Sequence, residues 1–200
     1  MTTEKTVPKR QIRAVYDDAT IRVYQAYSHS IADAAIAAQT FVSPPFKMAR
    51  MTWIKPSFLW MMYRAGWGLK DAGQHRILAI DIGRDGFEWA LSHSCASHAN
   101  EGAPHADWEK LKAASPVRIQ WDPERDLHHN PLEHRSIQIG LGGEAVHRYV
   151  NEWIHAITDV TAEAQAIKAL VDADHLDAAR ERLPQERPYH AASYDAGTME

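Results

Sequence analysis

Residues 48–70, MARMTWIKPSFLWMMYRAGWGLK, combine bulk and positive charge more densely than any other segment of the chain, with three of its seven Trp and four of its six Met. Residues 48–54 alternate as a strand does. The run Lys55-Pro56-Ser57 then opens a helix with Pro at its first position, where the missing N–H costs nothing. Gly66 and Gly68 end this helix. Because its residues are apolar on almost every side, we expect the helix to be central or to floor a pocket.

Basic side chains flank the junction between this strand and this helix. Arg50, Thr52 and Lys55 stand where the N–H groups of a helix N-terminus and nearby cations can jointly receive an anion. The Met and aromatic residues at helical spacing are typical of a core. An anion site and a set of solvated surface charges therefore both remain open for the basic residues.

Length and composition limit the class of protein. Two hundred residues, 45% of them hydrophobic and 24% charged, are typical of one globular domain. The net charge of −4 means that a nucleic acid partner would need a local basic patch. One cysteine, Cys95, excludes an internal disulfide and favours a reducing compartment. Since no signal peptide or membrane-length apolar run is found, we expect a cytoplasmic protein with no membrane partner.

The ends of the chain differ in composition from its middle. Residues 1–10 are polar without periodicity, and residues 184–200 carry little apolar bulk. We therefore expect a flexible leader at 1–10, a single globular domain at 11–183 and a disordered tail at 184–200.

Short strands and helices follow one another without regular alternation. Strands are predicted at 21–27, 75–82, 117–121 and 135–141, and a short strand or turn at 12–16. Helices are predicted at 31–41, 107–113 and 144–159, with one or two terminal helices at 162–173 and 175–183. Residues 87–93 fit either a helix or a strand, and Pro123 indicates a turn at 121–125 that stops pairing. This pattern predicts an α+β fold with a mixed or mostly antiparallel sheet flanked by helices, and not a doubly wound nucleotide fold.

Two glutamines interrupt apolar strands. Gln25 shares a strand face with Ile21, Val23 and Tyr27, and Gln138 lies between two Ile. A buried amide without partners costs roughly 1–3 kcal/mol, so Gln25 is either fixed in a network or faces a wet cleft. For Gln138, an amide satisfied inside the sheet and a functional group both remain open.

The loop around residues 93–105 invites a metal hypothesis, because thiolate and imidazole are zinc ligands. Its candidate ligands are His93, Cys95, His98 and His105. Their spacing matches no compact metal pattern, so we expect no metal. A Gly-rich phosphate loop, a Gly-x-Ser-x-Gly elbow and a His-Glu-x-x-His pair are all absent from the sequence.

Several segments carry a resemblance to a known family. They are IRAVYD at 12–17, TIRVYQAY at 20–27, RMTWIKPSFLWMMYRAGW at 50–67, QWDPER at 120–125 and RSIQIG at 135–140. With these in place, the chain resembles a family of about this length, from bacteria and fungi, that is catalogued only as a domain of unknown function. The resemblance runs from about residue 10 to 160 and implies no activity.

The order of parts is also similar to that of ADP-ribosyltransferases, in which a first strand holds NAD, an aromatic residue stacks on nicotinamide, and a late Glu or Gln orients the ribose and the acceptor. This similarity implies an ADP-ribosyltransferase-like fold and a site of three contacts. The first would be Arg22, Tyr24 or Gln25, the second Thr52 or Trp53, and the third Gln138, with Tyr24, Gln25 and Gln138 as catalytic candidates. The same comparison makes Arg50, Lys55 and Arg64 candidates for holding the pyrophosphate.

Two functions follow as expectations. The first is an NAD-dependent ADP-ribosyltransferase-like enzyme; because no His stands in the first strand and Gln replaces the commoner Glu, nucleic acid becomes a candidate acceptor in place of protein. The second is a non-enzymatic module that binds RNA or single-stranded DNA through the same basic and aromatic residues. NAD turnover would distinguish the enzyme, and salt-dependent binding without NAD would distinguish the module.

Overall fold

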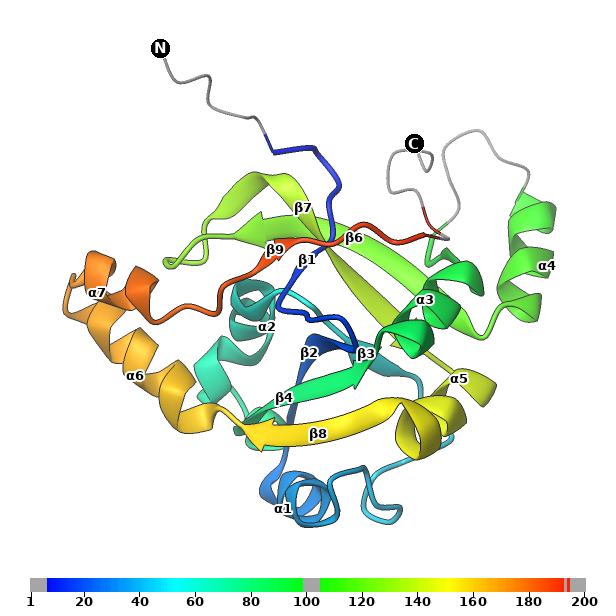
Figure 1. Ribbon diagram of the computed structural model, residues 1–200, viewed down its shortest axis with the longest axis horizontal. Helices are drawn as coiled ribbons and strands as arrows, with labels where there is room; N and C mark the ends of the chain where they lie inside the picture. The colour runs from blue at the N-terminus through cyan, green and yellow to red at the C-terminus, as the bar shows by residue number, and fades with distance from the viewer. Residues whose placement is uncertain (1–6, 99–104, 193, 195–200) are drawn as a thin grey trace.

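Two β-sheets meet near the centre of the molecule and carry the helices around them (Figure 1). The computed structural model describes residues 7–98, 105–192 and 194. Because most strand pairs are antiparallel and helices and strands do not alternate regularly, the predicted α+β class with a mixed, mostly antiparallel sheet is confirmed.

The first sheet has three antiparallel strands in the order β2 (Thr20–Tyr27), β4 (Arg76–Gly83) and β8 (Ile154–Asp159). Its side chains alternate between two cores. Ile21 and Val23 enter one hydrophobic cluster, whereas Tyr24 enters the other. This period of two is the one expected from the sequence of β2, and it makes the sheet a wall between the two clusters.

The second sheet has the strand order β3 (Thr52–Ile54), β7 (Pro131–Leu141), β6 (Val117–Arg125) and β5 (Ser94–Ala96). Only β5 and β6 pair in parallel. A short antiparallel pair is formed by β1 (Arg13–Ala14) and β9 (Arg187–Pro188). This pair lies above β2 and β4 in Figure 1.

Seven α-helices in the described residues surround these sheets. They are α1 (His29–Ala38), α2 (Phe58–Ala65), α3 (Arg84–Ser92), α4 (His105–Ala114), α5 (Glu144–Arg148), α6 (Thr161–Asp172) and α7 (Leu176–Glu181). In Figure 1, α1 lies below β8, α6 and α7 form the left edge, and α3 lies on the right. None of the described helices is both long enough and apolar enough to cross a membrane.

Helix α2 begins and ends at residues that the sequence marks clearly. The Ser57 hydroxyl accepts a hydrogen bond from the Trp60 N–H at 3.1 Å, and Gly66 closes the helix at φ 55°. Pro56 precedes the cap, so its predicted place at the first helical position is wrong. The predicted strand is also shorter, because the Arg50 N–H bonds to the Lys47 carbonyl and keeps residues before Thr52 in a turn.

Two other predicted elements need correction, and one left open is resolved. The predicted helix 144–159 ends as α5 at Arg148, continues as a π-helical turn (Tyr149–Trp153), and becomes strand β8, because its β-branched end pairs with β4. The predicted turn at 121–125 belongs to β6: Pro123 stays paired with Arg135 because β5 covers only the first residues of β6 and leaves that edge free. Residues 87–93, left open above, fall mostly in α3.

The described part of the predicted tail, residues 184–192, packs against the domain, so the disordered assignment is wrong there. Arg187 and Pro188 pair with β1, Tyr189 is 4% exposed, and the Glu186 carboxyl group accepts a 2.7 Å hydrogen bond from the Phe58 N–H. At the other end, the Arg135 N–H donates to the Lys9 carbonyl. Residues 1–6, 193 and 195–200 lie outside the described part, as do the predictions made for them.

Candidate functional site

The two sheets touch through strands β2 and β3, at a single backbone bridge. The Tyr24 N–H donates to the Lys55 carbonyl at 2.8 Å, and no other described residues of β2 and β3 form a backbone pair. Next to this bridge, the Gln25 amide nitrogen donates to the Trp53 carbonyl at 3.2 Å. The Gln25 side chain therefore takes the place of a backbone N–H. In a continuous sheet, a backbone N–H of β2 would donate to the Trp53 carbonyl.

Gln25 is the centre of a buried polar network. Its side-chain nitrogen also contacts the hydroxyls of Thr52 at 2.6 Å and Tyr27 at 3.0 Å, and its oxygen accepts from the Tyr149 hydroxyl at 2.8 Å. The Tyr27 and Thr52 hydroxyls lie 2.8 Å apart. Gln25 is only 3% exposed, so these partners offset the cost of burying its amide. Of the two alternatives stated for Gln25, the network is confirmed, and the residue also lines a cavity.

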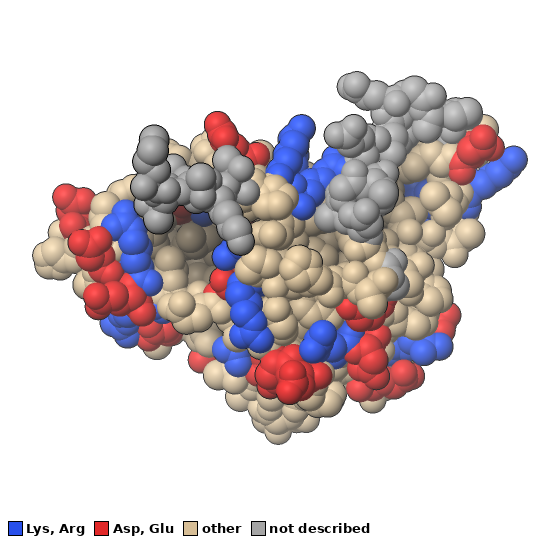
Figure 2. Space-filling model, turned by 45° about the horizontal axis from the view of Figure 1, so that its top comes forward, with Lys and Arg blue, Asp and Glu red and all other residues tan. Residues whose placement is uncertain are grey.

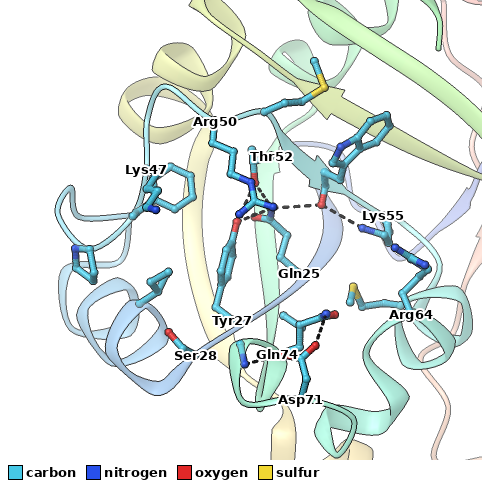
Figure 3. Close-up of a pocket in the computed structure, with 18 residues that line it drawn as sticks. Gln25, Tyr27, Ser28, Lys47, Arg50, Thr52, Lys55, Arg64, Asp71 and Gln74 are labelled. Carbon is cyan, nitrogen blue, oxygen red and sulfur yellow. Dashed lines mark hydrogen bonds between the residues drawn. The ribbon is translucent and has the colours of Figure 1, made fainter.

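This cavity opens where β2 and β3 separate, and its volume is about 490 Å³ (Figure 3). Its lining comes from β2, the start of α1 and the loop after it, β3 and the residue that follows it, α2, and the segment before β4. The lining residues are Gln25, Ala26, Tyr27, Ser28, Ile31, Pro45, Phe46, Lys47, Arg50, Met51, Thr52, Trp53, Lys55, Met61, Arg64, Asp71, Gly73 and Gln74. The volume is in the range of pockets that bind small molecules.

The charged side chains around the cavity are mostly positive. Lys47, Arg50, Lys55 and Arg64 line it, against one carboxylate, Asp71. Within the described part of the chain, none of these four cations is in an ion pair. A concave site lined by unneutralised cations concentrates anions, so the cavity suits a negatively charged ligand.

Lys55 differs from the other three cations because it is buried. It is 7% exposed, and its ammonium nitrogen lies 3.3 Å from the Trp53 carbonyl. Burial, together with the positive charge of Arg64, lowers the pKa of Lys55 to about 7, while Asp122 acts in the opposite direction. A large fraction of Lys55 is therefore an uncharged amine at neutral pH.

The two tyrosines of the network are fixed as neutral phenols. Burial raises the pKa of Tyr27 to about 12, and it raises the pKa of Tyr149 well above its ordinary value. Both hydroxyls therefore keep their protons across the physiological range and act as hydrogen-bonding groups.

Six of the residues singled out in the sequence line this cavity together, namely Gln25, Arg50, Thr52, Trp53, Lys55 and Arg64. The other three lie elsewhere. Arg22 forms a bidentate pair with Asp81, Tyr24 packs in the core against Phe58, and Gln138 donates to Asp122 at 2.6 Å.

Several cavity residues were not among the candidates. Tyr27 of the cavity lining and Tyr149, which lies outside the lining and bonds to Gln25, carry hydroxyls within apolar patterns. A buried hydroxyl needs a partner, so this signal was readable in the sequence. Lys47, Asp71 and Gln74 come from loops, and only the tertiary fold brings them to the cavity. The loop residues carry no periodic signal that could have identified them.

The described part of the His-rich loop, residues 93–98, does not line this cavity. Cys95 is buried in β5, and His93 stacks on Trp89 with ring centroids 4.0 Å apart. No group of three or more His, Cys, Asp or Glu in the described residues is placed to hold a metal ion. The His105 side chain lies outside the described part.

Fold and cavity together define an α+β protein with a cation-lined cavity at the split between two sheets. Residues 11–189 match the family described as a domain of unknown function (DUF4291), and the chain belongs to that family. The resemblance inferred from the sequence is thereby confirmed, and the family extends into the packed part of the predicted tail. No curated protein matches the chain.

Proposed function

We propose that this protein is an NAD-dependent ADP-ribosyltransferase-like enzyme that takes NAD as its substrate in the cavity between β2 and β3. The observation that carries the proposal is the group of Lys47, Arg50 and Arg64, which line one cavity of about 490 Å³ and form no ion pair within the described part of the chain. The order of parts also supports it, since β2, α1, β3 and the late strand β7 follow one another as the sequence similarity implies. We place the reaction in the cytoplasm, as the sequence indicates.

The chemistry of the lining suits NAD. The pyrophosphate of NAD carries negative charge that Arg50, Arg64 and Lys47 would hold, and Arg is well matched to phosphate oxygens. Trp53 and Tyr27 line the same cavity and would supply aromatic surface for the nicotinamide or adenine ring. The hydroxyls and amides of the same wall provide donors and acceptors for ribose.

The transfer itself needs positioning more than a strong protein nucleophile. The bond between nicotinamide and ribose breaks, its electron pair leaves with nicotinamide, and the lone pair of an acceptor forms the new bond to ribose while the acceptor loses a proton. Positive charge develops on the ribose, so a site that fixes the pyrophosphate and the ring lowers the barrier by orientation and electrostatics. The network around Gln25 would keep the cavity wall rigid during this step.

Gln138 has a different place in this proposal. It lies outside the cavity lining and donates to Asp122, whose charge acts on Lys55. Gln138 would therefore influence the site through Asp122 and Lys55, as a positioning residue. A nucleic acid acceptor remains part of the proposal, because the first-strand His and the late Glu of the commoner pattern are both replaced.

The second candidate function is binding of RNA or single-stranded DNA without catalysis. Aromatic and basic residues occur together in the cavity, as such binding requires. However, Figure 2 shows acidic and basic side chains interspersed over the visible face rather than a continuous basic track. A confined cavity favours a dinucleotide over a long strand.

Labelled NAD tests the proposal directly. The purified protein is incubated with NAD labelled in the adenine part, alone and with RNA or single-stranded DNA, and released nicotinamide and transferred label are both measured. The proposal expects turnover that falls at least about tenfold in Arg50→Gln, since one lost phosphate contact is worth about 1.4 kcal/mol or more. Arg180→Gln, an equal change of charge on exposed α7, is the matched control. Absence of NAD turnover together with salt-sensitive oligonucleotide binding would favour the second function.

A further inference from the structure

Lys55 combines burial with a position on the wall of the cavity. Among the described lysines it alone is buried, yet it lines the cavity. Among the described residues, its side-chain nitrogen has one hydrogen-bond partner, the Trp53 carbonyl at a long 3.3 Å, and no carboxylate ion pair. In Figure 3 it lies at the opposite end of the labelled side chains from Lys47. Lys47 lines the same cavity but is exposed, and this makes it an internal reference.

The groups around Lys55 favour its uncharged form. Desolvation at the junction of the two sheets acts first, and Arg64 of α2 adds repulsion to a protonated amine. Asp122 of β6 opposes both, and the phenols of β2 nearest the junction, Tyr24 and Tyr27, stay neutral because burial raises their pKa. An amine made nucleophilic by desolvation and a neighbouring cation is the arrangement that forms Schiff bases with carbonyl compounds.

We propose that Lys55 forms a Schiff base with a small phosphorylated aldehyde or ketone bound in the cavity. The lone pair of the Lys55 nitrogen attacks the carbonyl carbon and a C–N bond forms. The carbonyl oxygen then leaves as water with two protons from the amine, and a C=N double bond remains. The step needs no oxidant or reductant.

The phosphate in this ligand class follows from the other cations. Arg50 and Arg64 line the cavity with Lys55, and neither is in an ion pair with a described residue. Arg50 and Arg64 would bind the phosphate of the ligand and so place its carbonyl group next to the Lys55 amine. The two arginines would thus determine which carbonyl compounds bind, and Lys55 would react with them. This site stands whether or not NAD is the substrate of the cavity.

Reductive trapping tests the proposal with the intact protein. Pyridoxal 5′-phosphate, which carries both an aldehyde and a phosphate, is added near pH 7, the adduct is fixed with sodium borohydride, and the modified lysines are located by peptide mapping. We expect Lys55 to carry at least about tenfold more adduct than Lys47 in the same sample, because only an uncharged amine attacks. Pyridoxal without phosphate should label Lys55 several-fold less.

The comparison between lysines is internal to the wild-type protein, so it does not depend on the folding of a variant. Lys55→Arg, which keeps a positive charge but offers no nucleophilic amine, should lose the main adduct. Equal labelling of Lys47 and Lys55, or an unlabelled Lys55, would overturn the proposal. Equal labelling by pyridoxal and its phosphate would overturn the phosphorylated ligand class.

Discussion

The Tyr149 hydroxyl donates a 2.8 Å hydrogen bond to the side-chain oxygen of Gln25, joining the π-helical turn after α5 to strand β2 in the core. This bond fixes the orientation of the amide, so its nitrogen faces Thr52 and the Trp53 carbonyl of the other sheet. The geometry of the cavity wall therefore depends on the Gln25 amide, whose oxygen bonds to Tyr149 and whose nitrogen bonds to Thr52 and Trp53.

Replacing Gln25 with Ala should destabilise the fold. The change leaves the buried Tyr149 hydroxyl without its acceptor and the Trp53 carbonyl with only the 3.3 Å bond from Lys55. We expect a loss of about 3 kcal/mol in the free energy of unfolding. Urea unfolding monitored by circular dichroism measures it. Gln74→Ala, which removes a surface hydrogen bond to Asp71, is the control and should cost less than about 0.5 kcal/mol. Equal losses in the two variants would contradict a central role for Gln25.

Replacing Lys55 with Met should stabilise the protein near neutral pH. The unfolded lysine keeps its proton up to its ordinary pKa of 10.5, whereas the folded one releases it at about 7. The unfolded state therefore binds more protons between these values, and wild-type stability contributed by this group rises with pH through this window. The penalty is largest below pH 7, where Lys55→Met should raise the free energy of unfolding by roughly 1–3 kcal/mol.

Urea unfolding at pH 6 and pH 9 separates this effect from a simple gain in apolar packing. The advantage of Lys55→Met over wild type should shrink from the lower to the higher pH. Lys47→Met, a change at an exposed lysine of the same cavity, should show no such trend. An advantage that stays constant with pH would mean that the amine of Lys55 is not held in its uncharged form.

Glu186 should give the opposite pH dependence. Burial raises the pKa of its carboxyl from 4.5 to about 8, with Glu124 adding to the shift and the Phe58 N–H opposing it. A raised carboxyl pKa contributes stability that is complete below pH 4.5 and is lost as pH rises through 8. Glu186→Gln, which retains an acceptor for the Phe58 N–H, should therefore gain on wild type as pH rises across this window. Thermal unfolding at several pH values measures the trend.

The control for Glu186 is Glu181→Gln, a change of the same charge at an exposed position of α7. Its unfolding temperature should follow that of wild type at every pH. If both variants gain the same increase in unfolding temperature, the effect arises from the net charge of the protein. It would then not arise from burial of Glu186 at the start of α2.

Gly86 should not tolerate a side chain. A Cβ at this position would lie 2.4 Å from Cγ of Trp153, within the packing between α3 and the π-helical turn. We expect Gly86→Ala to lower the free energy of unfolding by roughly 1–3 kcal/mol, because the indole would have to move in a filled core. Gly142→Ala is the control, since its Cβ would meet the flexible end of Met51 at 3.2 Å. If the two variants lose similar amounts of unfolding free energy, the Trp153 side chain can move to accommodate the added methyl group, which would contradict the prediction.

Local sequence signals predicted the elements whose form depends on their own residues. The alternation of Ile21, Val23 and Tyr24 predicted both faces of β2, and Gly66 predicted the end of α2. The segment that became β8 carries an apolar pattern that continues a helix, and only pairing with β4 makes it a strand. Such pairing between distant residues overrides local propensity.

The candidate site was predictable in part for the same reason. Arg50, Thr52 and Lys55 are close in sequence and face one cavity, so the basic junction identified them together. Lys47 and Asp71 reach that cavity through loops, and no periodic pattern marks them. The lowered pKa of Lys55 could not be read from the sequence, because it arises from burial where two separate sheets meet.

Calorimetric titration of the purified protein with NAD at low salt tests the central claim most directly. The account predicts saturable binding that weakens about tenfold in Arg50→Gln and in Arg64→Gln, and is unchanged in the Arg180→Gln control. Absence of NAD binding to the wild-type protein, or equal binding by all three variants, would contradict the assignment of this cavity as an NAD site.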